Sequence, residues 1–427
     1  MKKRMFGSLI SNDYIFSIFV KIMMLVVGVV HSAFLARFLG AELKGIAATI
    51  TSSVSLFQMI ITCGMHQAYP YFKRHGQIKD FLNVFINNVY FIYSVIFLAM
   101  ISIATIFHFV IPDKIVCVLI LIPLFAYETI VNYIYLIEKP KKKNLWNLIS
   151  SVSETVIIVL FWFVFEPNYP FMVIAISLSI TIRAIASTVG LGVPFKIKHI
   201  SLRFIAKMLR FGIMPMIALI LTVLNSKIDI LMLDANPVIT SAAIGLYSVG
   251  IGVADKILSI PDAIREILLS KLVSGKNEKE VSRVTRISVI LCTAMAIVMT
   301  LLGKVIIDLL YGSEFAGAYN VLVITAFGTV FMVFLKMISQ YNIVNKKQTS
   351  NLLFLAISVI TNIVLNILLI PHLGIEGAAI ASFVGHFVCA VCFIVYFRMK
   401  TGAKLRELII PQKEDLAILL NFKKNKT

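Results

Sequence analysis

The chain has 427 residues, of which 59% are hydrophobic and 14% are charged, and its formal net charge is +19. This composition excludes a soluble globular domain, because such domains carry about 25% charged residues. The distribution of Lys and Arg assigns the positive charge to membrane topology and to contact with anionic lipid, not to nucleic-acid binding. The sequence therefore predicts an all-α integral membrane protein.

Apolar windows of about 19 residues predict twelve membrane-spanning helices. The N-terminus begins with basic residues, but no small-residue cleavage site follows, so we interpret the first apolar segment as a retained span. In chain order, the expected spans are 14–36, 46–69, 82–111, 115–137, 145–165, 171–192, 211–234, 243–270, 287–310, 319–343, 351–370 and 377–397.

Basic residues determine the expected orientation of these spans. If the N-terminus is cytoplasmic and the spans alternate, the inward segments hold 30 of the 40 Lys and Arg residues. The outward loops then hold three, and seven lie inside spans. The positive-inside rule requires this asymmetry, and the inverted orientation contradicts it. We therefore expect both termini in the cytoplasm.

The longest inward connection divides the chain into two halves of six spans. Its basic residues recur every three or four positions, which places them on one stripe of a helix. We interpret it as an amphipathic helix with its basic face on lipid phosphates, or as a plain linker, and both interpretations stay open. The expected domains are an N-terminal six-helix bundle (1–193), a cytoplasmic amphipathic linker (194–210), a C-terminal six-helix bundle (211–397) and a basic cytoplasmic tail (398–427).

Short motifs mark several helix connections. A Leu-Gly-x-x-x-x-Gly pattern at 39–45 follows the first span, and Leu-Tyr-Gly at 310–312 precedes the tenth. Pro and Gly residues at 371–377 predict a hairpin of six or seven residues that breaks both flanking helices. Asn362 and Asn366 are four apart, so their amides share one helix face. That face should look into protein or water, because an amide facing lipid is costly.

Charged residues inside the spans are the candidate site residues. A Lys or Arg at mid-bilayer costs about 2.5–3.5 kcal/mol on insertion scales, so each needs a polar cavity or a partner. Asp262 and Arg265 are three apart and can pair locally, while for the others both cavity lining and pairing stay open. The candidate substrate-binding residues are Lys21, Arg183, Lys256, Arg265 and Lys336, and the candidates for coupling or structural pairing are Glu154, Asp229 and Asp255.

The sequence predicts no catalytic site, no metal site and no cofactor. Cys389 and Cys392 have helical spacing, but no second ligand pair accompanies them. Gly312 and Gly317 have the spacing of a phosphate-binding loop, but the Lys that such a loop needs is missing. We therefore expect no ATP use within this chain.

Taken together, these motifs resemble the polysaccharide flippases of the MOP superfamily. The resemblance implies two six-helix bundles around a central cavity that opens alternately to the two faces of the bacterial inner (cytoplasmic) membrane. Its cargo would be an oligosaccharide repeat unit on undecaprenyl pyrophosphate, for O-antigen, lipopolysaccharide or capsule biosynthesis, with a polymerase and other polysaccharide-assembly proteins as partners. The residues that carry the resemblance are Gly40, Gly45, Pro215, Asp229, 310–312 and 361–385.

Two other functions fit a chain with a dozen spans. A multidrug or small-molecule exporter of the same superfamily usually moves cations, so it would need acidic rather than basic cavity groups. An oligosaccharide polymerase or ligase resembles chains with a large outward loop of basic catalytic residues. Here the outward loops are short and hold only three basic residues. The basic residues inside the spans therefore favour the flippase.

The orientation can be tested by cysteine labelling in a background without the five native cysteines. We expect single cysteines at Glu42 and Glu376 to react with an impermeant reagent from outside, and one at Lys142 to be protected in intact cells. The reason is the excess of basic residues in the inward segments. External labelling at Lys142 would contradict the topology.

Overall fold

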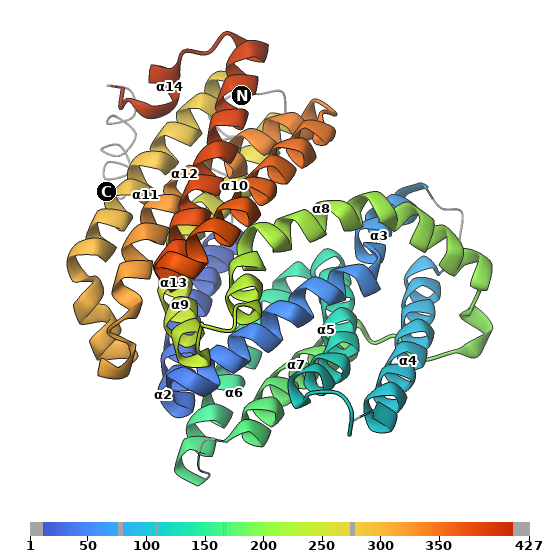
Figure 1. The fold of residues 1–427 in the computed structure, drawn as a ribbon. Helices are drawn as coiled ribbons and strands as arrows, with labels where there is room; N and C mark the ends of the chain where they lie inside the picture. The colour runs from blue at the N-terminus through green and yellow to red at the C-terminus, as the bar shows by residue number, and fades with distance from the viewer. Residues whose placement is uncertain are drawn as a thin grey trace. The chain divides into compact units, whose positions relative to one another are not determined.

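The computed structural model describes residues 12–75, 80–107, 109–164, 166, 168–273 and 278–412. Within these ranges the chain is helical and has no β-strand (Figure 1). Its helices are α2 (Asn12–Thr62), α3 (Met65–His75), α4 (Phe81–Phe107), α5 (Asp113–Glu138), α6 (Pro140–Val164), α7 (Tyr169–Leu191), η1 (Ile197–His199), α8 (Leu202–Ala235), α9 (Ser241–Ala254), η2 (Asp255–Leu258), α10 (Ser259–Val273), α11 (Glu278–Leu310), η3 (Ser313–Phe315), α12 (Ala318–Val344), α13 (Gln348–Thr401) and α14 (Leu405–Ile409).

The helices identify a multi-pass membrane protein. Among the described residues, 9 helices are long and apolar enough to cross a membrane. Two of these correspond to two predicted spans each. The helix Met23–Arg74, which runs through α2 and α3, holds most of the first predicted span and all of the second, and α13 holds the last two. Every predicted span lies largely on described helix. The count of twelve crossings stays a prediction, because helix length and composition do not fix it.

Glycine breaks the two longest helices. Gly40 inside α2 has φ 69° and ψ 175°, and Gly374 inside α13 has φ 56° and ψ −130°. Residues with a Cβ avoid these conformations, so glycine is required at both positions. The break predicted at 371–377 is present, but it is shorter than the six or seven residues expected, because Pro371 lies in helix and the non-helical dihedral angles occur at Gly374.

The chain folds as two compact units, Met1–Val223 and Leu224–Thr427, and the boundary falls inside α8. In the first unit, α5 packs against α2, α4 and α7, and α6 packs against α2 and α7. In the second, α12 is central and packs against α9, α10, α11 and α13. These packings bring polar side chains from several helices together within each unit.

The connection between α7 and α8 differs from the sequence-based expectation. Of the two interpretations left open for 194–210, a single helix does not describe its first half, because α8 begins at Leu202 and the short 3₁₀ turn η1 precedes it. A buried amide on α4 explains this. Asn88 donates to the carbonyl of His199 (2.9 Å) and accepts from the amide of Ser201 (2.8 Å). These bonds compete with the helical ones and hold the segment in a non-helical form.

The start of α8 packs closely against the end of α2, and this contact can be tested. A Cβ at Gly212 would overlap the carbonyl oxygen of Cys63. We expect Gly212→Ala to lower the free energy of unfolding by about 1–3 kcal/mol, the usual cost of overpacking. Gly28→Ala is the control, because nothing lies within 4 Å of a Cβ there. Thermal unfolding in detergent measures both, and equal midpoints would contradict the contact.

Candidate functional site

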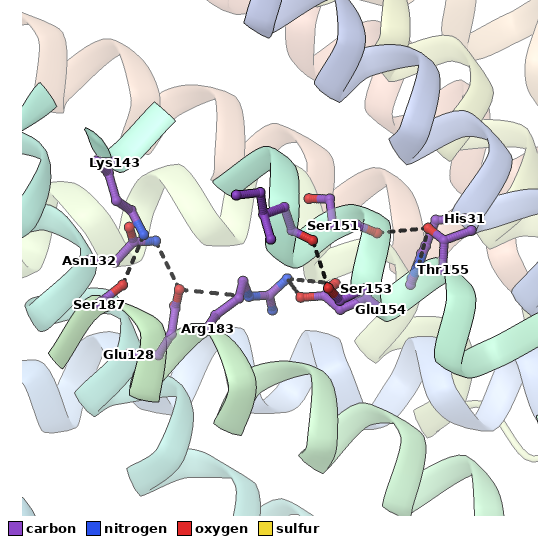
Figure 2. Close-up of polar contacts among 11 residues, drawn as sticks. His31, Glu128, Asn132, Lys143, Ser151, Ser153, Glu154, Thr155, Arg183 and Ser187 are labelled. Atoms are coloured by element: carbon purple, nitrogen blue, oxygen red, sulfur yellow. Dashed lines mark hydrogen bonds and ion pairs between the residues drawn. The ribbon is translucent and has the colours of Figure 1, made fainter. Parts of the chain in front are cut away.

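Three helices of the first unit carry polar residues at helical spacing. On α6, Lys143, Asn147, Ser150 and Glu154 follow one another at steps of four, three and four. Such spacing keeps side chains on one face. Because α5, α6 and α7 pack together, their polar faces meet inside the unit and form a polar seam (Figure 2). The seam also contains Glu128 and Asn132 on α5 and Arg183 and Ser187 on α7.

Arg183 lies between two carboxylates of this seam. Its Nη1 donates to Glu154 Oε2 at 3.1 Å, and its Nε lies 3.7 Å from Glu128 Oε1. The Glu154 side chain is only 6% exposed, so an unpaired charge there would be strongly unfavourable. The sequence named Arg183 and Glu154 separately, and the structure joins them as an ion pair.

Lys143 is a buried cation that the sequence analysis missed. It is 2% exposed, its Nζ donates to Ser187 Oγ at 2.9 Å, and it lies 5.6 Å from the centre of the Tyr135 ring. Burial lowers the pKa of Lys143 to about 8, while Glu128 raises this pKa and Arg183 lowers it further. Basic residues between spans are expected to face water, which is why Lys143 was not singled out. Its helical spacing with Glu154 was the available signal.

The second unit contains a buried network around Asp229. Asp229 Oδ1 accepts from Asn366 Nδ2 at 2.7 Å, and Oδ2 accepts from Tyr247 at 2.8 Å and from Ser382. Asn366 also donates to Asn362 Oδ1 at 2.7 Å. Asn362 and Asn366 are buried, which confirms that their helix face looks into protein. Asp229 thus accepts hydrogen bonds from three donors, and its role in coupling or in structural pairing stays a prediction.

Two of the predicted cations share one carboxylate in the second unit. Lys336 Nζ lies 2.6 Å from Asp262 Oδ1, and Arg265 Nη2 lies 4.0 Å from the same oxygen. The local pair of Asp262 and Arg265 is therefore present, at the long end of ion-pair distances. Lys336, for which cavity lining and pairing were both open, is paired.

Lys256 differs from these cations. It lies on η2, the short turn that interrupts the span between α9 and α10, next to the exposed Asp255. Among the side chains that the structure describes, none forms an ion pair with Lys256 within 4.0 Å. The Lys21 side chain lies outside the described residues. The binding and coupling roles assigned to these residues stay predictions.

The Asp229 network generates a stability prediction. We expect Asp229→Ala to cost about 3 kcal/mol or more, because three donors lose their acceptor and each unsatisfied buried group costs about 1–3 kcal/mol. Asp308→Ala on α11 is the control, since Asp308 is exposed and surface changes usually stay within about 0.5 kcal/mol. Thermal unfolding of the purified variants in detergent measures the difference. A similar loss of unfolding free energy in the two variants would show that the Asp229 network does not stabilise the second unit.

Comparison with known proteins places the chain in a family. Residues 11–262 match the family model described as "Polysaccharide biosynthesis protein". The uncharacterized membrane protein MJ1068 of Methanocaldococcus jannaschii is 33% identical over 144 residues, or 33% of this chain. The alignment spans only 27% of that relative's length.

Solved structures show the same fold at low identity. The lipid II flippase MurJ in an inward closed conformation gives a TM-score of 0.72 at 14% identity, over 97% of this chain and 93% of that one. An inward-facing multidrug resistance transporter of the MATE family and MOP superfamily gives a TM-score of 0.64 at 13% identity. The match covers 91% of this chain and 99% of that one. The family model covers more than half of the chain. The protein therefore belongs to the polysaccharide biosynthesis protein family, and it shares its fold with solved structures of a lipid II flippase and of a MATE transporter of the MOP superfamily.

Proposed function

We propose that the protein is a flippase for polyprenyl-pyrophosphate-linked oligosaccharide repeat units. It moves them from the cytoplasmic to the outer face of the bacterial inner membrane by alternating access, for O-antigen or capsule biosynthesis. The carrier is undecaprenyl pyrophosphate, and a polymerase uses the exported units. The sugar and the pyrophosphate cross within the protein while the prenyl chain stays in lipid.

The proposal of an anionic cargo depends mainly on one observation, which is that Lys256 has no ion pair among the described side chains. It lies inside the apolar span Ser241–Arg265. A lysine at such a depth is costly unless a partner or a polar path compensates it. A pyrophosphate sheds much of its water on entering the protein, and a lysine replaces part of that solvation. An unpaired lysine is therefore suited to meet it.

The oligosaccharide part of the proposal is supported by the family. The match over 11–262 is to polysaccharide biosynthesis proteins. The fold is shared with a protein named as a flippase for lipid II. The polar seam of the first unit, with its amides and hydroxyls, supplies the groups that sugar hydroxyls require.

An exporter of cationic small molecules is the second candidate, and Asp255 favours it. This carboxylate is exposed and lies directly beside Lys256 on η2. A cation would bind the carboxylate, whereas a pyrophosphate would be repelled by it. The fold is also shared with a multidrug resistance transporter. Asp255 therefore favours a cationic cargo, whereas its neighbour Lys256 favours an anionic one.

The proposal is tested in a strain that lacks the chain. We expect undecaprenyl-linked repeat units to accumulate on the cytoplasmic face, and the wild-type chain to restore surface polysaccharide. Wild-type protein that reaches the membrane without clearing these lipids would overturn the proposed function.

Substitutions on η2 separate the two cargoes. We expect Lys256→Gln to lower surface polysaccharide about tenfold, because a charge-assisted contact is worth about 1.5–3 kcal/mol. Asp255→Asn should have a smaller effect. Lys304→Gln is the matched control, because Lys304 packs over the Tyr319 ring at 5.1 Å, away from η2. Resistance to cationic dyes that depends on Asp255, with polysaccharide unchanged, would favour the exporter.

A further inference from the structure

The polar seam of the first unit borders an open pocket that the proposed pyrophosphate contacts do not use. The pocket has a volume of about 290 Å³, and α3, α5 and α6 contribute its walls. Its polar lining includes His66, Glu128, Asn132, Lys143 and Asn147. Ligand pockets in proteins run from about 300 to 1,000 Å³, so this one has room for a single small ring.

Several polar groups of this pocket have hydrogen-bonding capacity to spare. His66 is 3% exposed, and its Nδ1 has no hydrogen-bond partner among the described residues. Glu128 Oε1 accepts from Asn132 at 2.8 Å and lies 3.7 Å from Arg183, while Oε2 has no hydrogen bond to the part of the chain that the structure describes. Buried polar atoms normally have partners, so His66 points to an occupant.

The spare groups include both donors and acceptors. Lys143 has three N–H donors, and its one hydrogen bond to the described residues goes to Ser187. The amide of Asn147 makes no hydrogen bond with them and offers both functions. Glu128 Oε2 offers a charged acceptor on the same lining. A ligand that only accepts, or only donates, would leave part of this lining unpaired.

This mixture distinguishes a sugar from an oxyanion. Each sugar hydroxyl donates and accepts, so one ring can bridge Glu128 and Lys143. A phosphate only accepts and would face the Glu128 charge. The Tyr133 ring, which His66 meets edge-on with centroids 5.1 Å apart, and Leu136 add apolar surface to the lining for the C–H face of a ring.

We propose that this pocket binds one sugar ring of the transported glycan, with Glu128 as acceptor, Lys143 as donor and Asn147 as both. His66 Nδ1 forms a further hydrogen bond to the ring. The inference rests on the proposed function, since the ring belongs to the lipid-linked oligosaccharide. It assigns the first unit a sugar subsite that is separate from the pyrophosphate contact at Lys256.

Binding can be measured on the full chain in lipid nanodiscs. Trp146 directly precedes Asn147, so in a Trp162→Phe background its fluorescence reports on this part of α6. The probes are methyl glycosides of a hexose, an N-acetylhexosamine and a hexuronic acid, and inorganic pyrophosphate. We expect at least one glycoside to give a saturable change that pyrophosphate does not compete away. If none of the glycosides gives a saturable change in fluorescence, the pocket holds only water and the inference is wrong.

Two substitutions test the chemistry. We expect Asn147→Ala and Glu128→Gln each to weaken glycoside binding about tenfold, because each removes hydrogen bonds or a charged acceptor. If the pocket binds an oxyanion instead, Glu128→Gln would strengthen the binding of that oxyanion, because it removes a repelling charge. Stronger pyrophosphate binding in this variant overturns the sugar assignment. Asn83→Ala, on α4 and outside the pocket lining, is the matched control and should bind as the wild type does.

Transport in cells separates this inference from the proposed function. We expect Asn147→Ala to clear lipid-linked repeat units severalfold more slowly than wild type, with equal protein in the membrane, and Asn83→Ala to be unaffected. Equal clearance by Asn147→Ala overturns the sugar subsite alone. Failure of the wild-type chain to clear these lipids overturns the proposed function, while glycoside binding by the purified protein still decides whether the pocket takes a sugar.

Discussion

Polar side chains on apolar membrane helices must find partners inside the protein, because the lipid core offers none. Each unit has a cluster of polar side chains that meets this requirement, and the two clusters do so in different ways. In the second unit, Asp229 receives hydrogen bonds from three neutral donors. In the first unit, the guanidinium of Arg183 is shared by two carboxylates. The packing of the helices in each unit depends on these contacts, since loss of one partner leaves the other buried and unpaired.

The division of the chain falls inside α8 because the two ends of this helix pack in different units. The first turns of α8 contribute Phe204 and Met208 to an apolar core with α3, α4 and α5. Further along, Asn225 accepts from Ser358 at 2.8 Å, and Asp229 binds Asn366. One end of the helix is therefore held by apolar contacts in the first unit, and the other by polar contacts in the second. A continuous helix thereby belongs to both units.

Much of the fold could be predicted because its signals are local. Apolar windows located the helices, and the Leu-Gly-x-x-x-x-Gly motif at 39–45 marked the connection that breaks at Gly40. Helical spacing placed the amides of Asn362 and Asn366 on one face. The errors came from tertiary contacts. The linker before α8 is not helical because Asn88, more than a hundred positions away, binds its backbone. Lys143 can be buried because Ser187, on another helix, accepts a hydrogen bond from it. A local pattern can place Lys143 on the polar face of its helix, but it does not identify partners so far away in the sequence.

The pairing of charges also narrows what the sequence suggested about cargo. Of the predicted cations, Arg183, Arg265 and Lys336 have carboxylates beside them. Under the proposed function, the positive charge available to a pyrophosphate is therefore much smaller than the net charge implies, and among the described candidates Lys256 would supply it. Weak electrostatic attraction suits a transporter, because a site that binds its cargo too tightly cannot release it. Under the proposed function, discrimination would then depend less on the pyrophosphate, which many lipid carriers share, than on contacts with the sugar.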